Sequence, residues 1–178
     1  MRSMTAARST HLPQQRQAYR AIGCAGLLAG CLDITAALVE SELKGKSPIH
    51  LFQAIAGGLL GMSSFQGGLA TAALGAFFHF LIATTASAVF YLTSRKLRFL
   101  LKYPIPSGLL YGIVVYIFMY YIVLPISAYH VKIALPPIVK LARDVGVHMF
   151  MVGLPISLVV RRYSVQTHGG GQPGVALS

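Results

Sequence analysis

Residues 21–39 read AIGCAGLLAGCLDITAALV, an apolar stretch that is long enough to cross a bilayer. Small residues recur along it at spacings of three and four, which places Gly26 and Gly30 on one face of a helix together with Asp33. A face of small residues lets another helix approach closely, and an ionisable group on that face points into protein rather than lipid. The stretch therefore predicts a membrane-spanning helix that carries a carboxylate inside the protein.

The composition of the whole chain is that of a membrane protein. Of its 178 residues, 55% are hydrophobic and 11% are charged, whereas a soluble domain has about 25% charged residues. The net charge of +11 would indicate nucleic acid as the partner of a soluble protein. Here the Lys and Arg residues stand in short flanks between apolar runs, where they set membrane topology. We therefore expect the lipid bilayer, and no nucleic acid, as the surroundings of this chain.

Four apolar stretches predict four spanning helices. They lie at residues 21–40, 67–93, 107–126 and 140–160. Between the first two, Ser47 and Pro48 form a typical helix start. The apolar segment that follows is too short to span, so it predicts a short helix over residues 48–61 that is either re-entrant or interfacial. Pro125 is expected to end or bend the third span.

These elements predict an all-α fold, an integral membrane four-helix bundle with one additional short helix between spans one and two. The bundle is expected to form a single transmembrane unit over residues 21–163. Residues 1–20 are polar and basic, and residues 164–178 are polar and glycine-rich, so both are expected to be disordered tails. The chain leaves no room for a separate soluble domain.

The distribution of basic residues predicts the orientation in the membrane. Ten Lys and Arg residues flank the spans on the side of the two termini, and five lie on the other side. Basic residues favour the cytoplasmic side, so both termini are expected to be cytoplasmic. One alternative is cleavage and lipidation at Cys31, because residues 28–31 (LAGC) resemble a bacterial lipoprotein cleavage box. The apolar run continues beyond Cys31, which favours an uncleaved helix.

The Asp and His residues within the predicted spans are Asp33, His79, Asp144 and His148. Asp33 and His79 are expected at similar depth on helices that cross in opposite directions, and Asp144 and His148 are four residues apart on one helix. Ionisable groups in hydrocarbon are costly, so they usually have a partner or a task. We consider two interpretations of this buried polar site. The residues either form hydrogen bonds that fix helix packing, or they handle protons or a ligand.

Five glycines, Gly26, Gly30, Gly75, Gly108 and Gly112, are predicted to pack helices closely. Such faces can meet within one chain or between chains, which keeps open a role as a structural or assembly subunit that binds other membrane proteins or a second copy. The sequence has no zinc-ligand cluster, phosphate loop or nucleophile elbow. We therefore expect no enzyme activity, no metal and no cofactor, and we disfavour a membrane-embedded enzyme that acts on lipid or quinone.

A set of motifs follows in a fixed order along the chain. It comprises GLLAG at 26–30, SP at 47–48, LGAFFHF at 74–80, GLLYGIVVY at 108–116 with a following LPIS, and DVGVHMFMVGLPISLVVRR at 144–162. This order resembles the pattern of a family of bacterial inner-membrane proteins similar to the YagU-type acid-resistance proteins. The resemblance implies a four-span protein of the bacterial cytoplasmic membrane that is linked to acid stress. It brings no catalytic residues with it.

Overall fold

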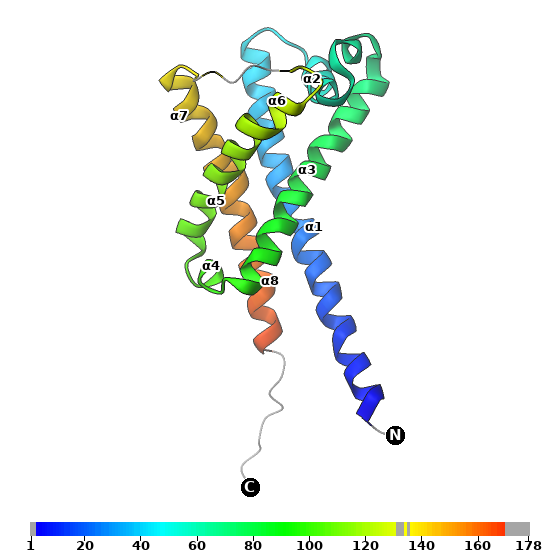
Figure 1. The fold of residues 1–178 in the computed structure, drawn as a ribbon, viewed down its shortest axis with the longest axis vertical. Coiled ribbons are helices and arrows are strands. Elements are labelled where there is room, and N and C mark those ends of the chain that lie inside the picture. Colours follow the sequence, from blue (N-terminus) through cyan, green and yellow to red (C-terminus); the bar gives the residue numbers. More distant parts are fainter. Residues whose placement is uncertain (1–2, 131–133, 135, 170–178) are drawn as a thin grey trace.

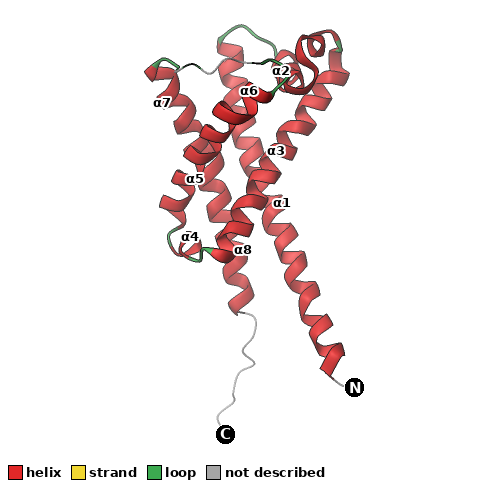
Figure 2. Ribbon diagram, viewed as in Figure 1, coloured by secondary structure: helices red, strands yellow, loops and turns green. Residues whose placement is uncertain are grey.

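The computed structural model describes residues 3–130, 134 and 136–169. All regular structure in this part of the chain is helical and no strand occurs in it (Figure 2). The first helix begins at Ser3 and so includes most of the N-terminal segment that we expected to be disordered. The expected disorder at the C-terminus falls mainly on residues 170–178, which lie outside the described residues.

The elements follow one another along the chain as α-helices, one 3-10 segment (η1) and two π-helical segments (η2 and η3). They are α1 (Ser3–Leu43), α2 (Pro48–Leu60), η1 (Gly61–Gln66), α3 (Gly68–Lys96), α4 (Phe99–Lys102), α5 (Pro104–Phe118), η2 (Met119–Val123), α6 (Leu124–Ile126), α7 (Ile138–Val147), η3 (His148–Gly153) and α8 (Leu154–Gly169).

Four helical stretches are long and apolar enough to cross a membrane. They are Gln15–Leu43, Gly68–Lys96, Pro104–Ile126 and Ile138–Ser164. The third consists of α5, η2 and α6, and the fourth of α7, η3 and most of α8. The predicted all-helical chain with four candidate spans is therefore confirmed, as expected for a multi-pass membrane protein.

The four long helices pack in a defined order. Helix α1 lies against α3 on one side and against α8 and η3 on the other, and α5 packs against α8 and η3. Both termini lie at one end of the molecule, and α2 lies at the opposite end beside the start of α3 (Figure 1). Near the end with the termini, the buried Ser157 hydroxyl donates a hydrogen bond to the Pro104 carbonyl at 2.8 Å, which ties α8 to α5.

Helix α2 is fixed in place by hydrogen bonds from two directions. The Gln53 side-chain amide donates to the Gly68 carbonyl at the start of α3 (3.1 Å). The Tyr129 hydroxyl, from the segment after α6, donates to the Ala54 carbonyl (3.0 Å). Gly61 ends α2 with a positive φ of 63°, a conformation that glycine adopts without strain. The chain therefore turns back sharply and begins α3 beside α2.

Close helix contacts occur at all five glycines that the sequence selected for packing. A Cβ atom at Gly26 would lie 2.6 Å from the Thr84 Cα, and one at Gly30 would lie 2.8 Å from the Phe80 ring. Cβ atoms at the other three would overlap atoms of α2, η3 or α8; these glycines are Gly75, Gly108 and Gly112. Each of these contacts joins two helices of the same chain.

Two prolines interrupt the regular α-helical pattern at corresponding places. The sequence Leu-Pro-Ile-Ser occurs twice, around Pro125 and around Pro155, and in each case a π-helical segment directly precedes it. A proline has no N–H for the carbonyl four residues earlier, here Tyr121 and Met151, and its ring clashes with that carbonyl. A wider π turn accommodates this loss. As expected, the third span ends at Ile126, directly after Pro125.

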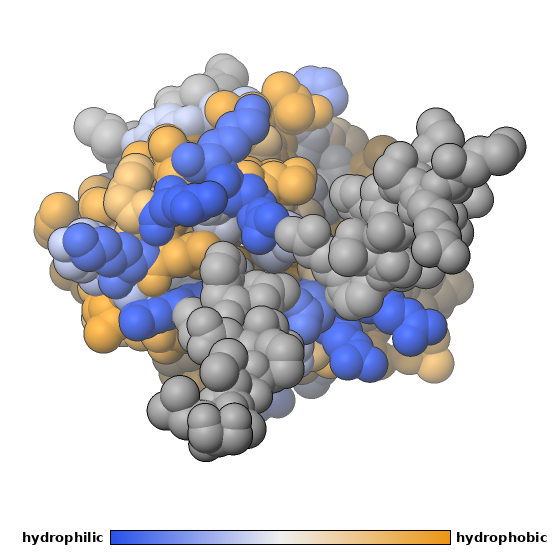
Figure 3. All heavy atoms as spheres, turned by 90° about the horizontal axis from the view of Figure 1, so that it is seen from below, coloured by the Kyte–Doolittle hydropathy of each residue, from blue (hydrophilic) through white to orange (hydrophobic). Residues whose placement is uncertain are grey.

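The outer surface of the spans is apolar and the end with the termini is basic. Large side chains such as Leu110 (63% exposed) and Leu92 (62% exposed) point outward, where lipid tails would surround them without penalty. Viewed from the end with the termini, hydrophilic side chains gather on this face (Figure 3). The exposed basic residues of these helix ends are Arg16, Arg20, Arg95, Lys96, Arg98, Lys102, Arg161 and Arg162.

Candidate functional site

A cavity of about 250 Å³ lies between the four long helices, and α2 contributes part of its wall. Three ionisable side chains line it, namely Asp33 from α1, His79 from α3 and His148 from η3. The other lining residues are apolar: Ala29, Ile34, Ala37, Leu51, Ile55, Ile82, Ala83, Ala86, Val115, Met119 and Val152. Three of the four ionisable residues selected from the sequence therefore share one mostly apolar cavity.

Asp33 is partly buried, and its carboxylate has no hydrogen bond or ion pair with any described residue. The direct contact with His79 that the sequence allowed is thus not formed within the described part of the chain. A carboxylate at the centre of a span costs about 2.5–3.5 kcal/mol on insertion scales. No described side chain offsets this cost, so the carboxylate of Asp33 stays available to a group that enters the cavity.

His79 ties α3 to α1 beside Asp33. Its Nε2 lies 2.8 Å from the carbonyl oxygen of Gly30, which is one helical turn before Asp33. A carbonyl oxygen only accepts, so Nε2 carries the proton and Nδ1 of the neutral ring is left as an acceptor. His79 and Asp33 thus lie close together and line the same cavity. The partner of the imidazole, however, is the backbone and not the carboxylate.

His148 is the first residue of η3 and is held by its own helix. Its Nδ1 donates to the backbone carbonyl of Asp144 at 2.8 Å, which leaves Nε2 of the neutral ring as an acceptor. The imidazole also meets the Tyr116 ring edge to face, with 5.5 Å between ring centroids. The spacing of four residues does bring His148 and Asp144 together, but through a main-chain oxygen rather than as an acid–base pair.

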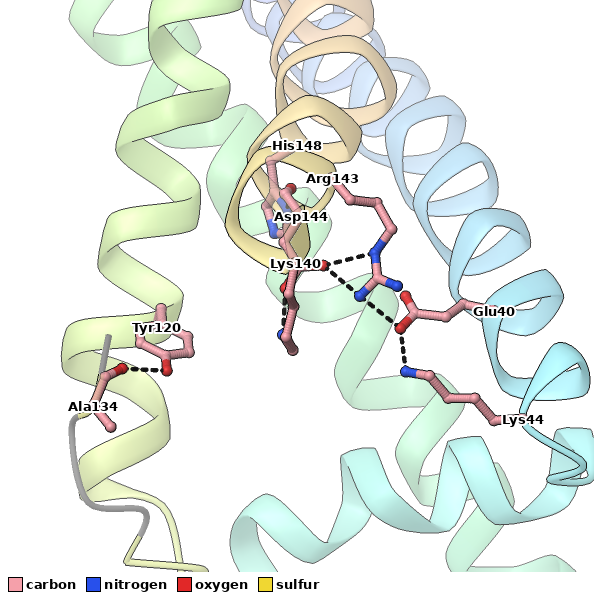
Figure 4. A network of polar contacts seen from close by, with 8 residues as sticks. All are labelled: Glu40, Lys44, Tyr120, Ala134, Lys140, Arg143, Asp144 and His148. Carbon is pink, nitrogen blue, oxygen red and sulfur yellow. Dashed lines mark hydrogen bonds and ion pairs between the residues drawn. The ribbon is translucent and has the colours of Figure 1, made fainter. Parts of the chain in front are cut away.

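Asp144 does not line the cavity, and its carboxylate forms ion pairs with neighbouring side chains instead. Its carboxylate accepts hydrogen bonds from Lys140 and from Arg143, the latter at 2.9 and 3.1 Å. Arg143 also pairs with Glu40 of α1 at 2.8 Å, and Glu40 pairs with Lys44 (Figure 4). This network joins α7 to α1 near the end opposite the termini. Asp144 is thus part of an ion-pair network and not of the cavity.

Several residues around the site were not identified from the sequence. Leu51 and Ile55 bring α2 into the cavity wall, and their spacing of four residues is a signal that could have revealed a shared face. Glu40 and Arg143 form the link between α1 and α7, for which a sequence gives no signal because the partners are far apart. Met119 is the first residue of η2, as His148 is the first residue of η3. The Leu-Pro-Ile-Ser sequence that follows both segments was the available indication that Met119 and His148 occupy corresponding positions.

The polar groups of the cavity can accept protons or hydrogen bonds. Among the described residues, no three His, Cys, Asp or Glu side chains come close enough together to hold a metal. One unpaired carboxylate and two histidines with vacant acceptor nitrogens offer sites that accept protons or hydrogen-bond donors. Comparisons of the chain with protein-family models, curated proteins and solved structures gave no match. The local geometry therefore carries the functional argument.

Proposed function

We propose that this chain is a bacterial cytoplasmic-membrane protein whose cavity binds and releases protons, in a role related to acid stress. In this proposal the four spans form a bundle in the bilayer, with α2 as an interfacial or re-entrant helix. One observation carries it. Asp33, His79 and His148 come from three different helices and line one cavity, and Asp33 has no partner among the described residues.

The energetic cost of Asp33 supports a task rather than a packing role. A packing hydrogen bond between membrane helices contributes about 0.6 kcal/mol on average, and Asp33 makes no such bond to the described residues. It lines a cavity that is large enough to hold water, since a site needs only about 10–15 Å³ of probe-occupied volume for one molecule. Water in the cavity would carry protons to and from Asp33. The ring nitrogens of His79 and His148 that are not used in hydrogen bonds line the same cavity and could take part in this exchange.

The basic end of the molecule supports an orientation with both termini in the cytoplasm. The four acidic residues of the chain are Asp33, Glu40, Glu42 and Asp144. In the candidate spans Gln15–Leu43 and Ile138–Ser164 they lie in the half that is remote from the termini. Basic flanks are retained on the cytoplasmic side during insertion. In this orientation α2 and the ion-pair network would face the periplasm, and the cavity would lie between the two sides.

A role as an assembly subunit is the alternative. The glycine faces that suggested it contact helices of the same chain at Gly26, Gly30 and Gly112. A partner protein or a second copy would therefore have to bind through another surface, such as the one around Gly23, where a Cβ would meet nothing within 4 Å. This leaves the proton-handling proposal with the stronger structural support.

Proton flux into proteoliposomes loaded with a pH-sensitive dye tests the proposal. Wild-type protein is expected to raise the flux above that of empty liposomes, and Asp33→Asn is expected to lower it to that background. Glu42→Gln is the matched control, because it also removes one carboxylate but from an exposed position outside the cavity. Flux that persists unchanged in Asp33→Asn at equal protein density would refute the proposal.

A further inference from the structure

An apolar groove between α3 and α5 lies beside the cavity. The groove has a volume of about 420 Å³. Four residues, Ile82, Ala86, Val115 and Met119, line both the groove and the cavity. The two spaces therefore adjoin one another, with these four residues between them.

The groove has only two polar side chains, and neither has a donor left for a ligand. Thr85 donates its hydroxyl proton to the Leu81 carbonyl (2.8 Å), and Tyr111 donates its own to the Ala86 carbonyl (2.7 Å). Every other lining side chain is apolar. The part of an occupant that lies in the groove must therefore be apolar, because a buried polar group without a partner is strongly disfavoured.

The cavity has the opposite preference. Its unpaired polar groups are the carboxylate of Asp33 and the second ring nitrogens of the neutral His79 and His148, and all of these accept hydrogen bonds. A protonated amine has three donors and no acceptor, and its positive charge would pair with the negative charge of an ionised Asp33. A carboxylate head group would be repelled, and an alcohol would leave the charge of Asp33 unpaired.

We propose that the cavity and the groove form one binding site for a single-chain amphiphile with a protonated amine head group. The chain lies in the groove between α3 and α5, and the ammonium group pairs with Asp33. The proposal deepens the proposed function and rests on it in one respect, namely that Asp33 gives up its proton inside the cavity. Both spaces are of the order of small-molecule pockets, which are roughly 300–1,000 Å³.

Radiolabelled dodecylamine is the probe, with the protein in phosphatidylcholine nanodiscs and empty nanodiscs as the blank. A zwitterionic lipid avoids concentrating the amine at an anionic surface. Saturable binding above the blank is expected for the wild-type protein. Unlabelled dodecylamine should displace the probe, whereas dodecanol and dodecanoic acid, which have the same chain length, should be at least about tenfold weaker competitors because they lack the ammonium–carboxylate pair.

Variants test the two halves of the site separately. Asp33→Asn is expected to weaken dodecylamine binding about tenfold or more through loss of the charged pair. Val115→Phe should weaken it similarly by filling the wall that the two spaces share. Leu110→Phe is the matched control, because it adds the same ring on α5 at an exposed position that lines neither space. Equal melting temperatures of the variants would show that the changes act on binding.

Three results would overturn the inference: no saturable binding, equal binding by Asp33→Asn, or equal competition by dodecanoic acid or dodecanol. The competition series uses only wild-type protein, so it does not depend on how the variants fold. Proton flux is measured on the same preparations. Asp33-dependent flux without amine binding would refute the amphiphile site alone, and amine binding without flux would refute the proton-handling proposal alone.

Discussion

Replacing Asp33 by leucine should stabilise the protein, whereas the same replacement at Asp144 should destabilise it. Asp33 lines an apolar cavity and has no partner among the described residues. Asp144 is bound by Lys140 and Arg143. The two residues are the same amino acid within spans of one chain, so a general effect of removing a carboxylate cannot produce opposite signs.

The expected magnitudes follow from the two surroundings. Leucine at residue 33 removes an insertion cost of about 2.5–3.5 kcal/mol. Water that enters the cavity would lower part of that cost, so a gain of about 1–3 kcal/mol is expected. Leucine at residue 144 removes the ion pairs with Lys140 and Arg143, whose side chains are 47% and 43% exposed. Solvent screening therefore limits the loss in the free energy of unfolding to about 1–2 kcal/mol.

The assay is reversible unfolding in mixed micelles of dodecyl maltoside and SDS, followed by circular dichroism. The free energy of unfolding is compared among wild type, Asp33→Leu and Asp144→Leu at one pH and one ionic strength. A clear loss of stability in Asp33→Leu would refute the reasoning, because it would mean that the carboxylate is held by an interaction that stabilises the fold. A stable but inactive Asp33→Leu would mark a residue kept for function at the expense of stability.

Three further predictions concern packing and helix contacts. Gly112→Leu should cost about 1–3 kcal/mol or prevent folding, because its side chain would overlap the backbone of η3, whereas Gly23→Leu should fold normally; thermal unfolding compares them. Tyr111→Phe removes the hydrogen bond to α3 and should lower the free energy of unfolding by about 1 kcal/mol in the same assay. A double-mutant cycle on Glu40 and Arg143 should give a coupling of about 0.2–1 kcal/mol that falls with added salt, since both side chains are partly exposed.

The fold class followed from the sequence because length and apolar content decide whether a helix can span a membrane. All four stretches appear as helices of 23 to 29 residues. The packing glycines were identifiable for a similar reason, since a spacing of three or four puts small residues such as Gly26 and Gly30 on one helix face. The packing order of the helices was not predictable. It depends on contacts such as that between Gly112 and His148, which are distant in sequence.

The candidate site was predictable only in part. Asp33 and His79 share a depth that can be counted from the ends of their spans, and both line the cavity. Asp144 does not line this cavity, and Lys140 and Arg143 lie within reach of its carboxylate instead. The spacing of Lys140 was visible in the sequence, but it competed with the spacing to His148. Which of two neighbouring side chains pairs with a carboxylate depends on their rotamers and on how far the residues lie from the end of the span.

The two π-helical segments explain why the cavity persists beside helices that otherwise pack closely. Gly112 and Gly153 bring α5 and η3 into backbone contact, which would favour a close-packed interior. Pro125 and Pro155 each follow a π segment, and the first residues of these segments, Met119 and His148, line the cavity. A π turn is wider than an α turn and is often found at functional sites. Here each π segment contributes its first residue to the wall of the space that Asp33 lines from the first span, while Gly112 and Gly153 hold the third and fourth spans together beside it.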